Sequence, residues 1–342
     1  MTKISRRSFI PIIGTAVIGA SCLSIQEPKF FSEERSKILP PKLKSGDTIG
    51  VSAPAGGIKS QSELDDFRKV LKELGFKVKF SKNCQKKFGY FSGTDEERAS
   101  DFMDLMQDEE VNGIFFLRGG WGCARILSLL DFDSIKKHPK VIMGFSDITT
   151  LLNAITTKTG LVTFHGPGGN STWNAYSVDY IKHLLINGES IKYSNISSDS
   201  KISTYSSGTA TGELFGGNLS VLCSLIGTDF LPDWKNKILF LEDVREEPYS
   251  IDRMLTQLKL AGVFKDVNGI ILGNFRKCTA EEPDRSFTLE EVFEQHFSAL
   301  SIPVFYGAQI GHVRNKFTVP VGVEVEMNAD EGRFNLLQPA VL

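Results

Sequence analysis

The sequence has few cysteines, few histidines and no excess of charge of either sign. Among its 342 residues are five cysteines and five histidines, and 39 basic side chains nearly balance 41 acidic ones. A chain this close to neutral lacks the basic footprint of a nucleic-acid-binding protein, so we expect no nucleic-acid partner. The cysteines form no C-x-x-C pair, and no H-E-x-x-H or Walker loop occurs. These absences argue against disulfide-rich, zinc-dependent and nucleotide-binding proteins, and we expect no metal site.

The apolar run nearest the N-terminus is too short for a membrane-spanning helix. It extends from Phe9 to Ala20, about 12 residues where roughly 20 are needed. Because it follows a basic start and precedes small residues, residues 1–22 are typical of an export signal, and SRRSFI resembles the twin-arginine type. Cys22 also resembles the lipid acceptor of bacterial lipoproteins. We therefore expect an exported protein, either periplasmic or anchored to the membrane through a lipidated Cys22.

Strands and helices alternate in the first half of the folded chain, after a polar, proline-bearing spacer over residues 23–42. Short β-rich runs are separated by amphipathic helical stretches over residues 60–75, 96–107 and 124–130. The expected strands are 48–53, 76–80, 113–117 and 141–145. Such alternation predicts an α/β domain over residues 43–175, with a parallel sheet covered by helices on both faces.

The composition changes beyond residue 174, where apolar spacing gives way to a serine-rich stretch. We interpret residues 176–210 as an interdomain linker and residues 211–342 as a second, β-rich domain. Strands are expected there at 238–241, 269–272, 304–309, 321–326 and 333–337.

Ser146 is the first candidate for chemistry, because it follows the predicted strand VIMGF and opens a helix. A serine on such a turn lies at the carboxyl edge of a parallel sheet, where ligands bind in open α/β folds. The helix N-terminus that begins at Asp147 could stabilise an oxyanion. GFSDI lacks the second glycine of a nucleophile elbow, and serine is also a preferred helix cap, so both interpretations stay open.

The segment RGGWG, residues 118–122, also lies between a predicted strand and a helix. Its glycines permit close approach to a ligand, so Gly120 could donate a backbone N–H to an oxyanion, or the loop could be only a tight turn. Arg118 could pair with a substrate carboxylate or be a solvated surface residue. Arg118 and Trp121 are therefore candidates for substrate binding.

A serine nucleophile needs a base, and two of the five histidines remain after surface candidates are set aside. His165, in FHGPGGN, could line the pocket, and His312 ends a predicted strand in the other domain. The residues alone do not rank one above the other. Glu242 ends the strand ILFL and could orient a histidine as the third member of a triad, or it could belong to a solvated acidic loop.

Together these motifs resemble the LD-carboxypeptidase family, the muramoyltetrapeptide carboxypeptidases of bacterial cell-wall metabolism. Eight segments match in order from residue 40 onward, namely PPKLKSGDTIGVSAPAG, GYFSGTDEERASDFMDL, IFFLRGGWGCARIL, GFSDIT, FHGP, GELFGGNLSVLCSLIGT, LFLEDVREEPYSIDRML and IGHVRNKFTVPVG. Each motif alone is weakly specific, but eight in the same order are highly specific.

The resemblance implies a flavodoxin-like N-terminal α/β domain, a β-rich swivelling C-terminal domain, a homodimer and no cofactor. It implies Ser146 as nucleophile, His312 as general base and Glu242 as the residue that orients it, with Asp147 and Gly120 supplying the oxyanion hole. His165 then joins the substrate-binding candidates. The implied reaction releases D-alanine from murein tetrapeptides. A related branch of the family hydrolyses peptidyl-nucleotide antibiotics, and a two-lobed peptide-binding protein without catalysis is the remaining alternative.

Overall fold

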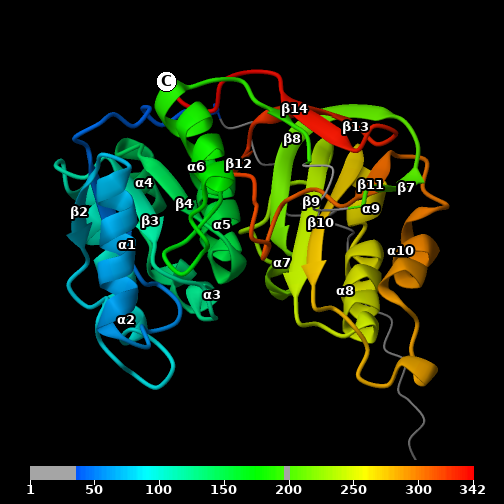
Figure 1. The fold of residues 1–342 in the computed structure, drawn as a ribbon, viewed down its shortest axis with the longest axis horizontal. Helices are drawn as coiled ribbons and strands as arrows, with labels where there is room; N and C mark the ends of the chain where they lie inside the picture. Colours follow the sequence, from blue (N-terminus) through cyan, green and yellow to red (C-terminus); the bar gives the residue numbers. More distant parts are fainter. Residues whose placement is uncertain (1–35, 196–200) are drawn as a thin grey trace, which may run out of the picture. The chain divides into compact units, whose positions relative to one another are not determined.

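The computed structural model describes residues 36–195 and 201–342, which contain two sheets. One six-stranded sheet has the order β12-β5-β4-β3-β1-β2, and the other, eight-stranded, has the order β6-β14-β13-β8-β9-β10-β11-β7. We call the first sheet with its helices the N-terminal lobe and the second with its helices the C-terminal lobe (Figure 1). Both lobes lie within one contact unit, Arg35–Leu342.

The N-terminal lobe has the parallel sheet that the alternating pattern predicts. Strands β1 to β5 run parallel, and the buried faces of β3 and β4 are apolar throughout. Its strands are β1 (Thr48–Ser52), β2 (Lys77–Phe80), β3 (Gly113–Phe116), β4 (Val141–Gly144), β5 (Thr163–His165) and β12 (Val319–Val321). Its helices are α1 (Gln61–Glu73), α2 (Asp95–Gln107), α3 (Cys123–Ile126), α4 (Phe132–Lys137), α5 (Thr149–Thr159) and α6 (Ala175–Ile181).

The C-terminal lobe is rich in strands, as expected, with a parallel centre and antiparallel edges. Strands β8, β9, β10 and β11 run parallel, whereas each pairing made by β13, β14, β6 and β7 is antiparallel. Its strands are β6 (Lys192–Tyr193), β7 (Ser203–Ser206), β8 (Thr209–Asn218), β9 (Lys237–Val244), β10 (Gly269–Arg276), β11 (Val304–Tyr306), β13 (Glu324–Asn328) and β14 (Arg333–Leu336). Its helices are α7 (Leu219–Leu225), α8 (Pro248–Leu260), α9 (Val263–Asp266) and α10 (Leu289–Phe297).

The single strand expected over residues 321–326 is wrong, because the chain forms two strands there in two different sheets. β12 pairs antiparallel with β5 in the N-terminal lobe, and β13 pairs with β8 in the C-terminal lobe. Gly322 lies between them with φ +90°, and a Cβ there would lie 2.5 Å from Thr156 Cγ2. A glycine is therefore needed where the chain passes from one sheet to the other.

The segment expected as a linker, residues 176–210, contains regular structure. It starts within α6 and continues as a π-helix, Lys182–Asn187. Its later part includes β6 and β7, and β7 pairs antiparallel with β11 at the edge of the second sheet. The two serines of β7 are the first and last residues of STYS, and Ser206 Oγ donates to the carbonyl oxygen of Leu300 at 2.9 Å. Serine-rich composition is thus compatible with an edge strand.

The predicted export signal and Cys22 lie outside the described residues, as does the first part of the predicted spacer. The other four cysteines are buried free thiols: Cys84, Cys123, Cys223 and Cys278. Within residues 36–195 and 201–342, no helix has both the length and the apolar character to cross a membrane.

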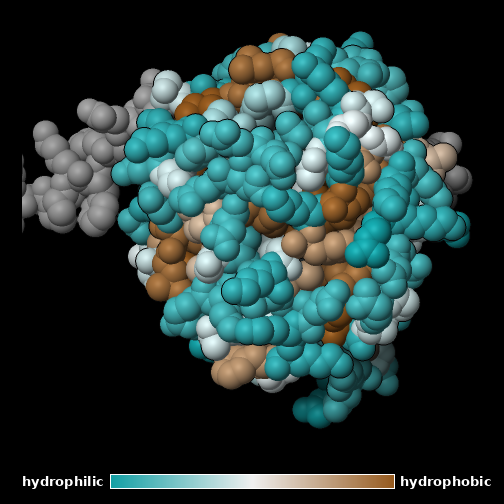
Figure 2. Space-filling view, turned by 90° about the vertical axis from the view of Figure 1, so that its left-hand side faces the viewer, coloured by the Kyte–Doolittle hydropathy of each residue, from teal (hydrophilic) through white to brown (hydrophobic). Residues whose placement is uncertain are grey.

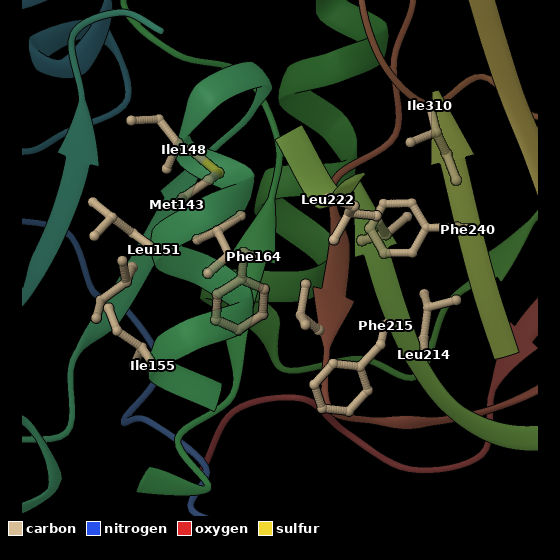
Figure 3. Packing of buried hydrophobic residues seen from close by; sticks show 14 of the residues in the cluster. Met143, Ile148, Leu151, Ile155, Phe164, Leu214, Phe215, Leu222, Phe240 and Ile310 are labelled. Atoms are coloured by element: carbon tan, nitrogen blue, oxygen red, sulfur yellow. The ribbon is translucent and has the colours of Figure 1, made fainter. Parts of the chain in front are cut away.

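One apolar core continues from the N-terminal lobe into the C-terminal lobe. Phe164 of β5 lies in the same buried cluster as Phe215 of β8 and Phe240 of β9, whereas Leu151 and Ile155 extend from the side of α5 that points away from β8 and β9 (Figure 3). All five are at most 4% exposed. Burial of this kind stabilises the contact by roughly 25 cal/mol for each Å² of apolar surface removed from water. The lobes are therefore held together by this shared core.

The opposite edge of the first sheet faces solvent. Edge strand β2 presents Lys77 and Lys79 outward, and Arg68 of α1 lies over the ring of Phe80, 4.8 Å from its centroid. The space-filling view from this side shows a mainly hydrophilic surface with small apolar patches (Figure 2). Lysines on an edge strand disfavour pairing with another chain.

Candidate active site

Ser146 lies on a sharp turn between β4 and α5. Its φ is +64°, one of four positive values among the described non-glycine residues, and it begins a 3₁₀ turn, Ser146–Ile148, that continues into α5. Such a conformation costs an ordinary residue of order 1 kcal/mol or more, so it persists only where the surroundings enforce it. The turn leaves Ser146 half-buried, while its neighbours Phe145 and Asp147 are buried. A strained serine at this edge of the sheet has the geometry of a nucleophile.

The glycine loop packs directly against this serine. A Cβ on Gly119 would lie 2.9 Å from Ser146 Cβ and 3.0 Å from its Oγ, closer than real Cβ atoms approach. Gly120 and Gly122 have φ values of +118° and +120°, which side chains rarely adopt. The glycines are therefore required both for contact with Ser146 and for the path of the loop.

The Asp147 side chain joins the two turns. Its Oδ2 accepts a hydrogen bond from the backbone N–H of Cys123, the first residue of α3, at 2.8 Å. Burial raises the pKa of this carboxyl, and the bond from Cys123 opposes that shift. The sequence pointed only to the backbone of Asp147, yet its carboxylate holds the end of the glycine loop beside Ser146.

The backbone N–H groups of Gly120 and Asp147 are available to a ligand. Neither donates to an acceptor in the described part of the chain. Two free N–H groups, one in the loop that packs against Ser146 and one in the residue after it, can stabilise an oxyanion that forms between them.

His312 and Glu242 meet in the C-terminal lobe. Glu242 is fully buried near the end of β9, and its Oε2 accepts a hydrogen bond from His312 Nδ1 at 2.7 Å. Burial alone would raise the pKa of Glu242, but the bond from His312 and the nearby imidazoles outweigh it, so the pKa lies below its usual value. With Nδ1 engaged by a carboxylate, His312 has Nε2 free to exchange a proton.

A glycine precedes His312 for a steric reason. Gly311 has φ +108°, and a Cβ there would overlap Glu242 Oε2 and lie 2.8 Å from Glu242 Cβ. The backbone of the His312 loop can therefore approach the carboxylate only without a side chain at this position.

The two lobes meet at Phe145, the residue before Ser146. Its ring centroid lies 4.9 Å from that of His312 and 6.3 Å from that of His165. Two buried hydrogen bonds fix the same junction. Thr149 Oγ1 accepts from the N–H of Asn218 at 3.0 Å, and Asn153 Nδ2 donates to the carbonyl oxygen of Gly216 at 2.9 Å. The structure thus places the turn that carries Ser146 next to the lobe that carries His312 and Glu242.

His165 also reaches Glu242, from the N-terminal lobe. Its Nε2 lies 3.9 Å from Glu242 Oε1, and within the described chain neither atom has a hydrogen-bond partner. Burial lowers the pKa of His165 to about 4, although the Glu242 charge opposes this shift. A neutral imidazole packed edge-on against Phe145 and Phe240 is a wall of the site. The two histidines therefore approach different oxygen atoms of the Glu242 carboxylate, His165 near Oε1 and His312 at Oε2.

The other two candidates lie around the glycine loop. Arg118 Nη1 donates to the carbonyl oxygen of Gly57 at 3.0 Å and pairs with Glu63 at 3.4 Å, whereas its buried Nε has no hydrogen-bond partner in the described chain. Trp121 is half exposed, with its ring centroid 6.2 Å from that of Tyr90. Trp121 offers an apolar surface beside the loop, and Arg118 links the loop to Gly57 and Glu63 of the N-terminal lobe.

One charged residue near the site was not singled out from the sequence. Lys316, four positions after His312, is 4% exposed, and its Nζ lies 4.4 Å from the centroid of the Phe145 ring. Its place inside the segment IGHVRNKFTVPVG was the available signal. No group of three or more metal-binding side chains gathers anywhere in residues 36–195 and 201–342.

Comparison with known families matches both lobes. The pattern of the LD-carboxypeptidase N-terminal domain matches residues 49–166, and that of the LD-carboxypeptidase C-terminal domain matches residues 211–327. The chain belongs to the LD-carboxypeptidase family. Its carboxypeptidase-named relatives support the same conclusion, so we describe it as a carboxypeptidase of this family.

Two curated relatives illustrate the breadth of the family. A probable murein peptide carboxypeptidase of Bacillus subtilis is 40% identical over 298 residues, which cover 85% of this chain and 92% of the relative. The microcin C7 self-immunity protein MccF of Escherichia coli is 32% identical over 340 residues, covering 88% of this chain and 96% of the relative.

Solved structures of both kinds have the same fold. MccF in complex with glutamyl sulfamoyl guanosine superposes with a TM-score of 0.82 at 27% identity, over 89% of this chain and 99% of that one. A muramoyltetrapeptide carboxypeptidase from Oxalobacter formigenes superposes with a TM-score of 0.73 at 30% identity, over 84% of this chain and 97% of that one.

Proposed function

We propose that this carboxypeptidase is a serine LD-carboxypeptidase that releases the terminal D-alanine from murein tetrapeptides. The observation that carries the proposal is the hydrogen bond between His312 and Glu242, held against the ring that precedes Ser146. The name of the Bacillus subtilis relative supports murein peptides as the substrate class. A strained serine, a carboxylate-bound imidazole and two free N–H groups are the parts that acyl transfer requires.

In the first half of the reaction, Ser146 Oγ attacks the carbonyl carbon of the penultimate residue while His312 Nε2 accepts the hydroxyl proton. The carbonyl oxygen becomes an oxyanion that accepts from the N–H groups of Gly120 and Asp147. Glu242 stabilises the imidazolium through Nδ1. The carbon–nitrogen bond then breaks, and His312 donates its proton to the leaving amine of D-alanine.

In the second half, water replaces D-alanine in the site. His312 Nε2 accepts a proton from the water, whose oxygen attacks the acyl carbon. The ester bond to Ser146 breaks, the proton returns to Oγ, and the shortened peptide leaves with a free carboxylate. The base acts twice, so its orientation by Glu242 matters in both halves.

The decisive experiment is Ser146→Ala, assayed for D-alanine release from a tetrapeptide ending in D-alanine. We expect the release rate to fall by a factor of roughly 10³ or more with an unchanged circular dichroism spectrum. Ser171→Ala, in the loop after β5, serves as a matched control and should retain activity. Unchanged release by Ser146→Ala would rule out the triad. A wild-type protein that binds the peptide without releasing D-alanine would instead be the two-lobed binding protein.

The second candidate function is the hydrolysis of a peptidyl-nucleotide antibiotic. The superposition with MccF, at a TM-score of 0.82, favours it. The export signal expected from the sequence argues against it, because an exported enzyme does not meet a toxin that acts in the cytoplasm. A competition assay that offers the tetrapeptide and an aspartyl sulfamoyl adenosine together separates the two, and we expect D-alanine to be the main product.

We also propose that the chain is exported and acts as a homodimer outside the cytoplasm. The basic, apolar and small-residue segments over residues 1–22 support export. Mass spectrometry of the mature N-terminus distinguishes a diacylglyceryl Cys22 from plain cleavage. Sedimentation of the mature protein tests the dimer.

A further inference from the structure

Lys316 differs from the other deeply buried cations of the described chain. Three basic side chains are less than 9% exposed, namely Arg98, Lys140 and Lys316. The Arg98 guanidinium donates to the carbonyl oxygens of Pro54 and Gly122 and pairs with Asp95. Lys140 Nζ donates to the carbonyl oxygens of Leu105 and Asp108.

The Lys316 ammonium has no such partner. Within the described residues it makes no hydrogen bond and no ion pair, and its recorded contact is the face of the Phe145 ring. Burial lowers the pKa of Lys316 to about 8, while the charge of Glu242 opposes this effect. Glu242 makes no ion pair with Lys316, although its charge acts on the ammonium. A buried cation without a counter-ion is costly, and an anion that enters the site would relieve this cost.

The position of the ammonium relates it to the reaction. The Phe145 ring contacts both Lys316 Nζ, at 4.4 Å, and the His312 ring, at 4.9 Å between centroids. In the proposed mechanism, His312 gives its proton to the amine of the leaving residue. The α-carboxylate of that residue is separated from the amine by one carbon atom, so it lies within a few ångströms of the imidazole.

We propose that the Lys316 ammonium binds the terminal α-carboxylate of the peptide substrate and thereby restricts cleavage to the last residue. The inference rests on the proposed function and adds the group that recognises the chain end. A carboxylate there would receive a charge-assisted hydrogen bond, stronger than one between neutral groups. Arg118, the cation expected from the sequence, differs from Lys316 because its Nη1 already donates to Gly57 and pairs with Glu63.

The test measures binding in a Ser146→Ala background, so that the peptide remains intact. Calorimetry compares a tetrapeptide ending in D-alanine with the same peptide ending in D-alanine amide. We expect the acid to bind roughly 10- to 100-fold more tightly than the amide, as for a hydrogen bond to a charged group. Adding Lys316→Met should abolish most of this preference, and Lys316→Arg should restore part of it.

The control is Lys140→Met in the same background, since it also removes a buried ammonium but one bound by backbone carbonyls. It should keep the preference for the acid. If Lys316→Met keeps the preference, or weakens acid and amide equally, the inference is wrong. Failure of the proposed function looks different, because the protein with Ser146 intact would then release no D-alanine.

Discussion

The two lobes build their halves of the site from different materials. The N-terminal lobe contributes mainly backbone, in the form of a serine at φ +64°, a glycine loop pressed against it and two free N–H groups. The C-terminal lobe contributes ionisable side chains, Glu242, His312 and Lys316, on and after strands of the second sheet. Activity should therefore be lost when a methyl group is added in the part of the site that the N-terminal lobe supplies. In the part that the C-terminal lobe supplies, it should be lost when a charge is removed without a change of shape.

The largest effect is expected from Glu242→Gln, which keeps the shape and removes the charge. The imidazolium loses its stabilisation and the favoured tautomer changes, so kcat/KM for D-alanine release should fall by roughly 10³ to 10⁴. Glu326→Gln, on the exposed face of β13, should leave the rate unchanged. If kcat/KM of Glu242→Gln fell less than tenfold, the charge of Glu242 would not be what the C-terminal lobe contributes to the reaction.

Gly119→Ala tests the backbone half by adding a single methyl group. Its Cβ would displace Ser146 Oγ from a distance of 3.0 Å, and small displacements of reacting atoms cost roughly 10²-fold in rate. We expect kcat to fall by about that factor, as measured by the rate at saturating peptide. Full activity with an added methyl group would show that Ser146 is not held by the loop.

Gly311→Ala tests whether the two lobes differ in this way, because it adds a methyl group to the backbone in the part of the site that the C-terminal lobe supplies. We expect a loss of roughly tenfold to 10²-fold as its Cβ pushes on Glu242. Gly46→Ala is the matched control, since its φ is +90° but a Cβ there would have nothing within 4 Å. Equal kcat/KM for both variants would attribute the effect to backbone strain alone.

The smallest effect concerns stability and the imidazole of His165, which the N-terminal lobe places near Glu242 Oε1. The folded-state pKa of His165, about 4, lies below the unfolded value of 6.5, so the folded state disfavours its protonation. This contribution is complete above pH 6.5 and is lost as the pH falls toward 4, by roughly 3 kcal/mol in total. Urea unfolding at pH 7 and pH 4.5 should show a smaller loss of stability in His165→Asn than in the wild type.

The control for that measurement is His183→Asn, which changes an exposed histidine. It should lose stability between the two pH values as the wild type does. If His165→Asn and the wild type lose equal stability, His165 is not buried in its neutral form.

Local patterns predicted four of the six strands of the first sheet, β1 to β4, and missed β5 and β12. The strands expected at 48–53 and 141–145 are found as β1 and β4, shorter by one residue each, because alternating apolar runs and flanking turns mark them in the sequence. β12 could not be found this way. Its three residues continue an apolar stretch into β13, and only Gly322 marks the point where the chain changes sheets.

The site residues that lie in a recognisable motif could be predicted from the sequence. Those whose role depends on contact between the two lobes could not. Ser146 could be located because it sits between a strand and a helix. His165 and His312 could not be ranked from the residues, since their order depends on which of them reaches Glu242 at 2.7 Å and which at 3.9 Å. Lys316 was missed because only the packing of the folded chain shows that its ammonium has no counter-ion.

The crossing strand β12 has a consequence for how the chain can be divided. It completes the first sheet beside β5, although it comes from a part of the sequence that otherwise builds the second sheet. A fragment ending at residue 195 would lack β12, so β5 would become an unpaired edge strand and His165 would lose its pairing with Val319. The two sheets are therefore not separable modules joined by a tether. A gene split in this region would yield fragments that complement one another only by strand donation.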